Sequence, residues 1–96
     1  MEVALECLER SGHLTIRADG TSMLPTIRPG AAVRVRRAGF ADVSPGDIVM
    51  VRVTDGIRLH RVVEKRLGEG CLVTRGDNHR HCDPPVSAHQ VLGVAE

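Results

Sequence analysis

Ser22 has a setting that favours a nucleophile. It stands in the stretch G-T-S-M-L-P-T-I-R-P-G, between Gly20 and Gly30, near the start of a chain rich in β-forming residues. A serine hydroxyl attacks a carbonyl only when a nearby base removes its proton. Taken alone, a serine is typically a surface hydrogen bonder. The hypothesis of acyl-transfer chemistry therefore depends on the segments that follow.

Three short sequence boxes follow Ser22 in order along the chain. They are P-G-D-I-V-M-V at 45–51, L-H-R-V-V at 59–63, and T-R-G-D-N at 74–78, with Asp83 shortly after. With the serine box, these segments resemble the signal peptidases of the S26 serine protease family, relatives of the LexA-type self-cleaving repressors. The resemblance runs from about Gly20 to Val94, and it implies a compact, mostly antiparallel β-fold with serine peptidase activity.

The resemblance gives His60 the role of general base. Bacterial signal peptidases have a lysine at this position of the box, whereas the archaeal and endoplasmic-reticulum branch has histidine. Histidine exchanges a proton readily near neutral pH, which suits a base that activates Ser22. Arg61 cannot deprotonate. Lys65 lies five residues beyond His60, so regular strand alternation places it on the opposite face.

A catalytic imidazole needs a carboxylate at its other nitrogen to hold the correct tautomer. Asp83 and Asp77 are the two candidates. Asp83 is six residues beyond Asp77, the spacing at which the eukaryotic-type relatives keep their triad aspartate, so we expect Asp83 to contact His60. Asp77 lies in a Gly-Asp-Asn sequence typical of a turn, and we expect it to brace the loop through backbone hydrogen bonds while assisting Asp83.

The residues around Ser22 are candidates for binding the oxyanion and the substrate. Many signal peptidases have serine two positions before the nucleophile, but this chain has Gly20, as LexA-type proteins do. The oxyanion hole would then depend on backbone N–H groups, chiefly that of Ser22. Thr21 is a further candidate. Met23 is expected to pack beneath the serine as an adaptable side chain, with Pro25 shaping the turn.

Potential metal ligands cluster just before Asp83. The cluster comprises His79, His81, Cys82 and Asp83. Their spacing fits no standard metal site, and a soft thiolate beside a hard carboxylate gives no clear metal preference. We expect a solvated polar loop, no resident metal and no cofactor. A metal bound there would occupy Asp83 and inhibit the triad.

Composition excludes several other classes of function. The formal net charge is +1 and the sole aromatic residue is Phe40, so a nucleic-acid partner is not expected. Three cysteines without C-x-x-C spacing indicate neither disulfides nor a zinc ribbon, which favours a reducing compartment. The sequence has no transmembrane run and an acidic N-terminal stretch. We therefore expect a soluble cytoplasmic protein, or a membrane-associated one if the chain is part of an anchored protein.

The expected fold is mostly β, because 13 valines favour sheet over helix. A short N-terminal helix is expected at 2–10, and an Asp-Gly hairpin is expected around 54–56. A polar loop is expected at 76–85. The expected strands are 14–17, 32–37, 48–53, 57–64, 70–75 and 91–95. The whole of 1–96 is interpreted as a single S26-type peptidase catalytic domain.

These observations predict a serine endopeptidase that cleaves an extended leader, propeptide or signal-like peptide through an acyl-enzyme. The family resemblance implies small residues such as alanine before the scissile bond. A membrane-associated partner remains compatible with this hypothesis. One alternative is a LexA-type self-processing regulator, although that class normally uses a lysine base. Another alternative is a β-module that keeps the fold without turnover.

Overall fold

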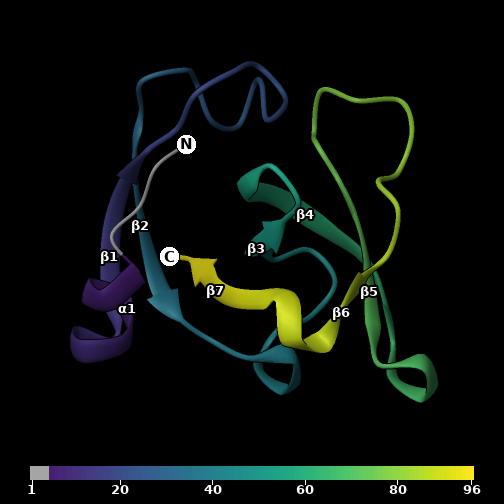
Figure 1. Ribbon diagram of the computed structural model, residues 1–96. Coiled ribbons are helices and arrows are strands. Elements are labelled where there is room, and N and C mark those ends of the chain that lie inside the picture. The colour runs from purple at the N-terminus through teal and green to yellow at the C-terminus, as the bar shows by residue number, and fades with distance from the viewer. Residues whose placement is uncertain (1–4) are drawn as a thin grey trace.

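In the part of the chain that the structure describes, seven strands form one antiparallel sheet in the order β1-β2-β7-β3-β4-β5-β6 (Figure 1). The computed structural model describes residues 5–96. One α-helix, α1, spans Leu5–Ser11. The strands are β1 (His13–Arg17), β2 (Ala32–Arg37), β3 (Ile48–Val53), β4 (Gly56–Arg66), β5 (Cys71–Arg75), β6 (Val86–Ser87) and β7 (Val91–Ala95). The expected fold class, mostly antiparallel β with one short helix, is confirmed.

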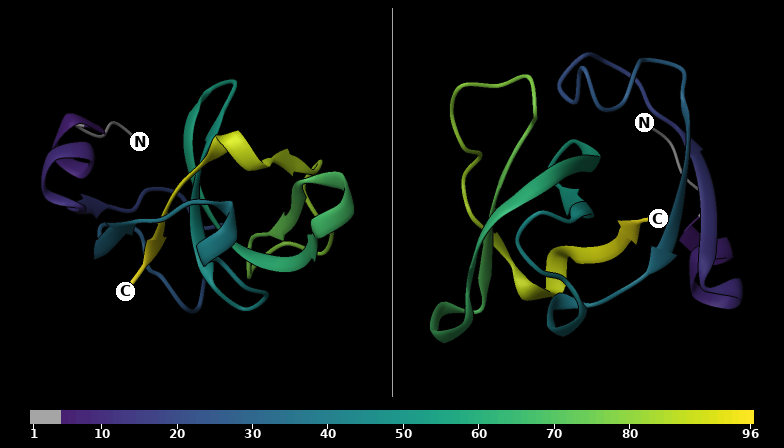
Figure 2. Two further views of the ribbon diagram at one scale, coloured as in Figure 1. Left: turned by 90° about the horizontal axis from the view of Figure 1, so that it is seen from below. Right: turned by 180° about the vertical axis from the view of Figure 1, so that it is seen from behind.

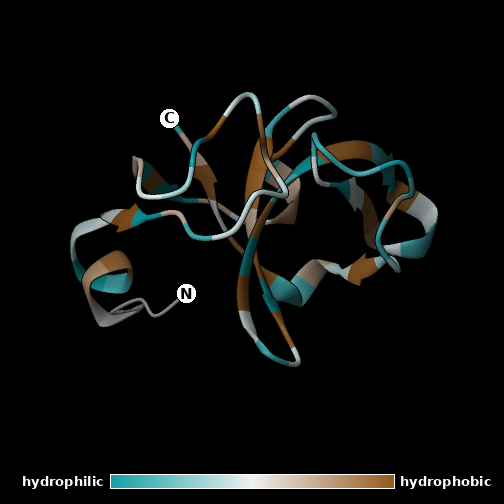
Figure 3. Ribbon diagram, turned by 90° about the horizontal axis from the view of Figure 1, so that it is seen from above, coloured by the Kyte–Doolittle hydropathy of each residue, from teal (hydrophilic) through white to brown (hydrophobic). Residues whose placement is uncertain are grey.

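Strand β3 is central because it is buried on both faces. Val49 and Val51 belong to one apolar cluster, whereas Met50, between them, belongs to a second cluster on the other face. All three are completely inaccessible to solvent. Alternate side chains of a strand point to opposite faces, so the continuous apolar run of β3 supplies both clusters. Figure 3 shows the hydrophobic residues gathered on the strands, while the loop at 76–85 is mostly hydrophilic.

Strand β2 shows the amphipathic pattern expected of its sequence. Val33 and Val35 are buried, and the arginines at 34, 36 and 37 are exposed. The helix α1 packs beside β1 and β2, to one side of the sheet (Figure 2). Its Leu8 is buried in the cluster that contains Val35. The first residues of the expected helix lie outside the described part of the chain, in which no helix is long and apolar enough to cross a membrane.

Strand β4 forms the expected hairpin with β3 and carries a bulge that the sequence did not reveal. Val53 pairs with Gly56, so Thr54 and Asp55 form the turn. Further along, the register with β5 shifts between Val62 and Glu64. The extra residue changes which side chains point to each face beyond this point.

The bulge overturns the expected position of Lys65. Val62 pairs with Thr74, and Lys65 pairs with Leu72. Thr74 and Leu72 are two residues apart on β5, so they point to the same face, and their partners Val62 and Lys65 do so too. Val62 is in turn two residues beyond His60 on β4. Lys65 therefore lies on the same face of β4 as His60, and the prediction of opposite faces was wrong. Its ammonium donates to the carbonyls of Val43 and Ala41 and lies 4.8 Å from the centre of the Phe40 ring.

Two long loops meet at one end of the sheet. The loop between β1 and β2 carries Ser22, and the loop between β5 and β6 carries Asp77 and Asp83. Figure 1 shows both loops at the top of the molecule, close to β4. The backbone N–H of Asn78 donates to the carbonyl of Ser22 at 2.8 Å, which ties one loop to the other. The fold thus brings the candidate residues together from three separate stretches of the chain.

Candidate active site

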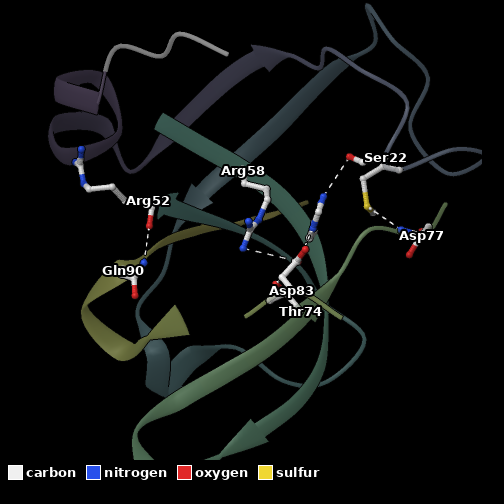
Figure 4. A network of polar contacts seen from close by, with 9 residues as sticks. Ser22, Arg52, Arg58, Thr74, Asp77, Asp83 and Gln90 are labelled. Carbon is white, nitrogen blue, oxygen red and sulfur yellow. Dashed lines mark hydrogen bonds and ion pairs between the residues drawn. The ribbon is translucent and has the colours of Figure 1, made fainter. Parts of the chain in front are cut away.

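The side chains of Ser22, His60 and Asp83 form a continuous hydrogen-bonded chain. Ser22 Oγ lies 3.1 Å from His60 Nε2, and His60 Nδ1 lies 2.6 Å from Asp83 Oδ2. With the proton on Nδ1, the imidazole donates to the carboxylate and accepts the serine proton at Nε2. In Figure 4 the dashed lines lead from Ser22 at one end to Asp83 at the other. The geometry matches that of an activated serine nucleophile.

His60 is held by a rigid and largely dry environment. It is 3% exposed and lies on β4, where it pairs with Val49 of the central strand. An imidazole fixed by strand packing on one side and by a carboxylate on the other has little rotational freedom. It is therefore oriented before any substrate arrives.

Two residues not foreseen from the sequence support Asp83. Thr74, fully buried on β5, donates its hydroxyl to Asp83 Oδ2 at 2.8 Å. The Arg58 guanidinium lies 3.7 Å from the same oxygen, and Arg58 Nε is buried without a hydrogen-bond partner among the described residues. Figure 4 shows both side chains directed at Asp83. Arg58 is two residues before His60 on the same strand, a spacing that places both on one face and could have indicated its position.

The carboxyl of Asp83 is held in its ionised form. Burial by itself raises its pKa, but the hydrogen bonds from His60 and Thr74, helped by the charges of His60 and Arg58, lower the pKa below the ordinary value for aspartate. An ionised carboxylate at this position stabilises the imidazolium that forms when His60 takes a proton.

Asp77 does not contact His60. It makes two charge-assisted hydrogen bonds to Arg61, at 2.8 Å from Nε and 2.7 Å from Nη2, and accepts a third from Thr26 at 2.6 Å. The Arg61 hydrogen bonds are the main cause that lowers the Asp77 pKa to about 2. Asp77 braces the loop as anticipated, but it does so through two side chains instead of through backbone groups. Its position gives no direct route to the imidazole.

The loop that carries Ser22 is fixed by contacts with the other loop. Gly20 adopts a φ of 71°, a left-handed conformation that favours glycine. Met23 is buried, and its Sδ accepts a hydrogen bond from the backbone N–H of Asp77 at 3.4 Å, which is a second link between the two loops. The Asn78 side-chain amide donates to the Thr21 carbonyl at 3.2 Å. The serine is thus positioned by its neighbours on both sides.

Gly76 allows this close approach because it has no side chain. A Cβ atom there would lie 2.7 Å from the Ser22 carbonyl oxygen and 3.1 Å from His60 Nε2. Both distances are shorter than ordinary contacts between heavy atoms. The glycine of the Gly-Asp-Asn box is therefore required by packing against the loop that carries Ser22, in addition to any need of the turn.

A comparison with known protein families identifies the family of this chain. The family model described as Peptidase S24-like matches residues 1–95. The chain belongs to the Peptidase S24-like family. No curated protein matches it.

A small cavity in this S24-like chain lies beside Ser22. Its volume is about 80 Å³. It is lined by Ala18, Asp19, Gly20, Ser22, Met23, Ile27, Ile57, Arg58 and Leu59. Among the described residues, the backbone N–H of Ser22 has no hydrogen-bond acceptor. The S24-like site thus combines an available backbone donor with a space for a small side chain.

The residues of the predicted metal-ligand cluster are only partly brought together in the S24-like chain. His79 lies against His60, with ring centres 5.4 Å apart and planes at 85°. His81 and Cys82 are exposed, and neither joins the group of close ligand atoms formed by His60, His79 and Asp83 among the described residues. The sequence cluster and the spatial cluster therefore share only two residues.

Proposed function

We propose that this S24-like chain is a serine endopeptidase that works through a Ser-His-Asp acyl-enzyme mechanism. The observation that carries the proposal is the hydrogen-bonded chain from Ser22 Oγ through His60 to Asp83. Within the wider S24/S26 superfamily, the histidine base favours the S26 branch that resembles archaeal and endoplasmic-reticulum signal peptidases. Residues 1–96 then act as one catalytic domain.

In the proposed reaction, Ser22 Oγ attacks the carbonyl carbon of the scissile peptide bond while its proton passes to His60 Nε2. The negative charge that develops on the carbonyl oxygen is stabilised by the backbone N–H of Ser22. The imidazolium gives its proton to the leaving amine, and the C–N bond breaks. Water then attacks the ester with His60 again acting as base, which releases the acid and restores Ser22.

The cavity beside Ser22 supports a preference for small side chains next to the scissile bond. A volume of about 80 Å³ suits a residue such as alanine better than an aromatic one. An extended peptide is the proposed substrate form, since extended chains commonly add to β-sheet proteins as strands. The proposed substrate is the leader or propeptide of one dedicated partner protein, which is either soluble or membrane-associated. The proposed location of the reaction is the cytoplasm.

A fluorophosphonate that acylates activated serines provides the test. The purified chain should gain the mass of one adduct, and peptide mapping should place that adduct on Ser22. Ser22→Ala should abolish labelling. Ser44→Ala, at an exposed serine outside the site, is the matched control and should react like the wild type. Absence of an adduct, or an adduct that survives Ser22→Ala, would refute the proposal.

A second candidate is self-processing of the LexA type, which the S24-like family match favours. In this reaction the same three side chains cleave a scissile segment that belongs to the protein itself or to a chain fused to it. Incubation of the longest natural form of the protein decides between the two. Self-processing predicts that the mass of the chain falls with a first-order rate constant that does not depend on protein concentration, and that Ser22→Ala shows no such change. The endopeptidase proposal predicts that the mass stays constant.

A further inference from the structure

His79 gives the candidate site a second imidazole that the proposed peptidase mechanism does not use. His79 is exposed, whereas His60 is buried, and the two rings meet edge to face. One ligand atom from each of His60, His79 and Asp83 lies within 4.8 Å of the other two. This spacing is close to what a shared metal ion requires, once exposed His79 rotates toward it.

The hydrogen bonds decide which atoms are available to a metal. His60 Nδ1 already faces the Asp83 carboxylate at 2.6 Å, so a cation would bind at Nε2, in place of the hydrogen bond from Ser22 Oγ. Metal-binding histidines commonly donate their other N–H to a carboxylate, an arrangement that fixes the ring and increases its basicity. Asp83 would thus orient the ligand without binding the metal itself.

His79 Nδ1 and His60 Nε2 both lie close to the same side of Gly76. A Cβ atom on this glycine would be 2.9 Å from His79 Nδ1 and 3.1 Å from His60 Nε2. Because Gly76 has no side chain, the region between the two nitrogens is not filled by one. Ser22 Oγ, 3.1 Å from His60 Nε2, borders the same region. Two imidazole nitrogens therefore face one space beside Gly76, and the Ser22 hydroxyl lies within hydrogen-bonding distance of one of them.

We propose that Zn²⁺ binds between His60 Nε2 and His79 Nδ1, beside Ser22 Oγ, and reversibly blocks the site. Zinc suits this set because imidazole nitrogen is among its preferred ligands, whereas Mg²⁺ and Ca²⁺ prefer oxygen. The bound ion occupies the lone pair that accepts the serine proton. Zinc binding is independent of the proposed peptidase function, and only its inhibitory effect rests on that function.

Isothermal titration calorimetry with ZnCl₂ tests the binding. The titrations use a background with Cys7→Ser and Cys82→Ser, so that neither exposed thiol contributes to zinc binding. We expect one site with a stoichiometry near one. His79→Ala should weaken binding by at least about tenfold, whereas His81→Ala, at an exposed histidine two residues away, should bind zinc like its parent. Equal losses in the two variants, or no loss in His79→Ala, would overturn the proposed ligand set.

Fluorophosphonate labelling tests the inhibition separately. Each variant is compared with its own zinc-free rate, so an effect of the substitution itself does not enter the result. Zinc should slow labelling of the parent and of His81→Ala, MgCl₂ should not, and EDTA should restore the rate. His79→Ala should require at least about tenfold more zinc for the same inhibition. If the chain is labelled normally and zinc does not slow the labelling, the proposed inhibition is refuted. If the chain is not labelled even without zinc, only the peptidase proposal is refuted.

Discussion

Asp77 and Asp83 are two aspartates of one loop with different partners. Asp77 is clamped by Arg61, and Asp83 faces His60. Because His60 and Arg61 are consecutive residues of β4, they point to opposite faces, so the loop presents one carboxylate to each face of the strand. Figure 4 shows Asp77 well separated from the group around Asp83.

The contrast shows how a partner determines what a carboxylate can do. Arginine keeps its charge at every accessible pH, so the pair of Asp77 and Arg61 is a permanent connection between loop and strand. A histidine can accept and release a proton, so the interaction of Asp83 with His60 changes in strength with each proton transfer. We infer that Asp77 stabilises the loop and that Asp83 assists the chemistry.

Among substitutions at the two aspartates and their threonine partners, Asp83→Asn should have the largest effect on reactivity. The amide cannot hold the imidazole tautomer that accepts a proton at Nε2, so the rate of fluorophosphonate labelling should fall by about 10⁴-fold. Thermal melting by circular dichroism should show a folded protein. A labelling rate within a few-fold of the wild type would remove the distinction between the two aspartates.

Asp77→Asn should chiefly reduce stability. The substitution weakens the paired hydrogen bonds with Arg61, and we expect a loss of about 1 to 2 kcal/mol in the free energy of unfolding, measured in urea. The labelling rate of the folded fraction should change far less than in Asp83→Asn. A loss of reactivity equal to that of Asp83→Asn, with stability unchanged, would contradict the assigned role.

The stability contribution of Asp77 should depend on pH in a defined window. Its pKa is lowered to about 2 in the folded chain, against about 3.9 in an unfolded chain. The ionised carboxylate therefore stabilises the fold fully above about pH 4, and this contribution is lost as the pH falls toward about 2. Urea unfolding of wild type and Asp77→Asn should give curves that converge across this window. A difference that stays constant down to pH 2 would exclude the ion pair as its source.

The smallest expected effects come from a matched pair of threonines, one for each aspartate. Thr74→Val removes the donor to Asp83 and should lower the labelling rate by about 5- to 30-fold, the equivalent of about 1 to 2 kcal/mol. Thr26→Val removes the donor to Asp77 and should leave the rate unchanged, with a stability loss of about 0.5 kcal/mol. Equal effects on rate would show that the two aspartates are not functionally separate.

Much of the sheet could be predicted from the sequence because its patterns are strong. The bounds expected for the strands at 32–37, 48–53 and 91–95 agree with β2, β3 and β7. Alternating valine and arginine, or an uninterrupted apolar run, identifies a strand directly. Strand β6 and the short 3-10 helices were not predicted, because two or three residues are too few to show a period.

The candidate site was foreseeable only in part. The boxes and the family resemblance identified Ser22, His60 and Asp83, and the structure brings Ser22 and Asp83 each within hydrogen-bonding distance of His60. Thr74 was missed because its contact with Asp83 depends on how the loop after β5 folds back, whereas Arg58 could have been placed on the face of His60 from its spacing on the same strand. The bulge after Val62 was invisible because a register shift is a property of two strands and not of one.

The three candidate site residues lie far apart along the chain, so the site can form only when most of the chain has folded. Ser22 and His60 are separated by 38 positions, and His60 and Asp83 by 23 more. Such long-range contacts form only after extensive loops have closed, late in folding. During synthesis, the serine and histidine would leave the ribosome well before the aspartate that orients them. Under the proposed mechanism, a nascent or partly folded chain therefore has an ordinary, unreactive serine, and the complete fold is needed to make it a nucleophile.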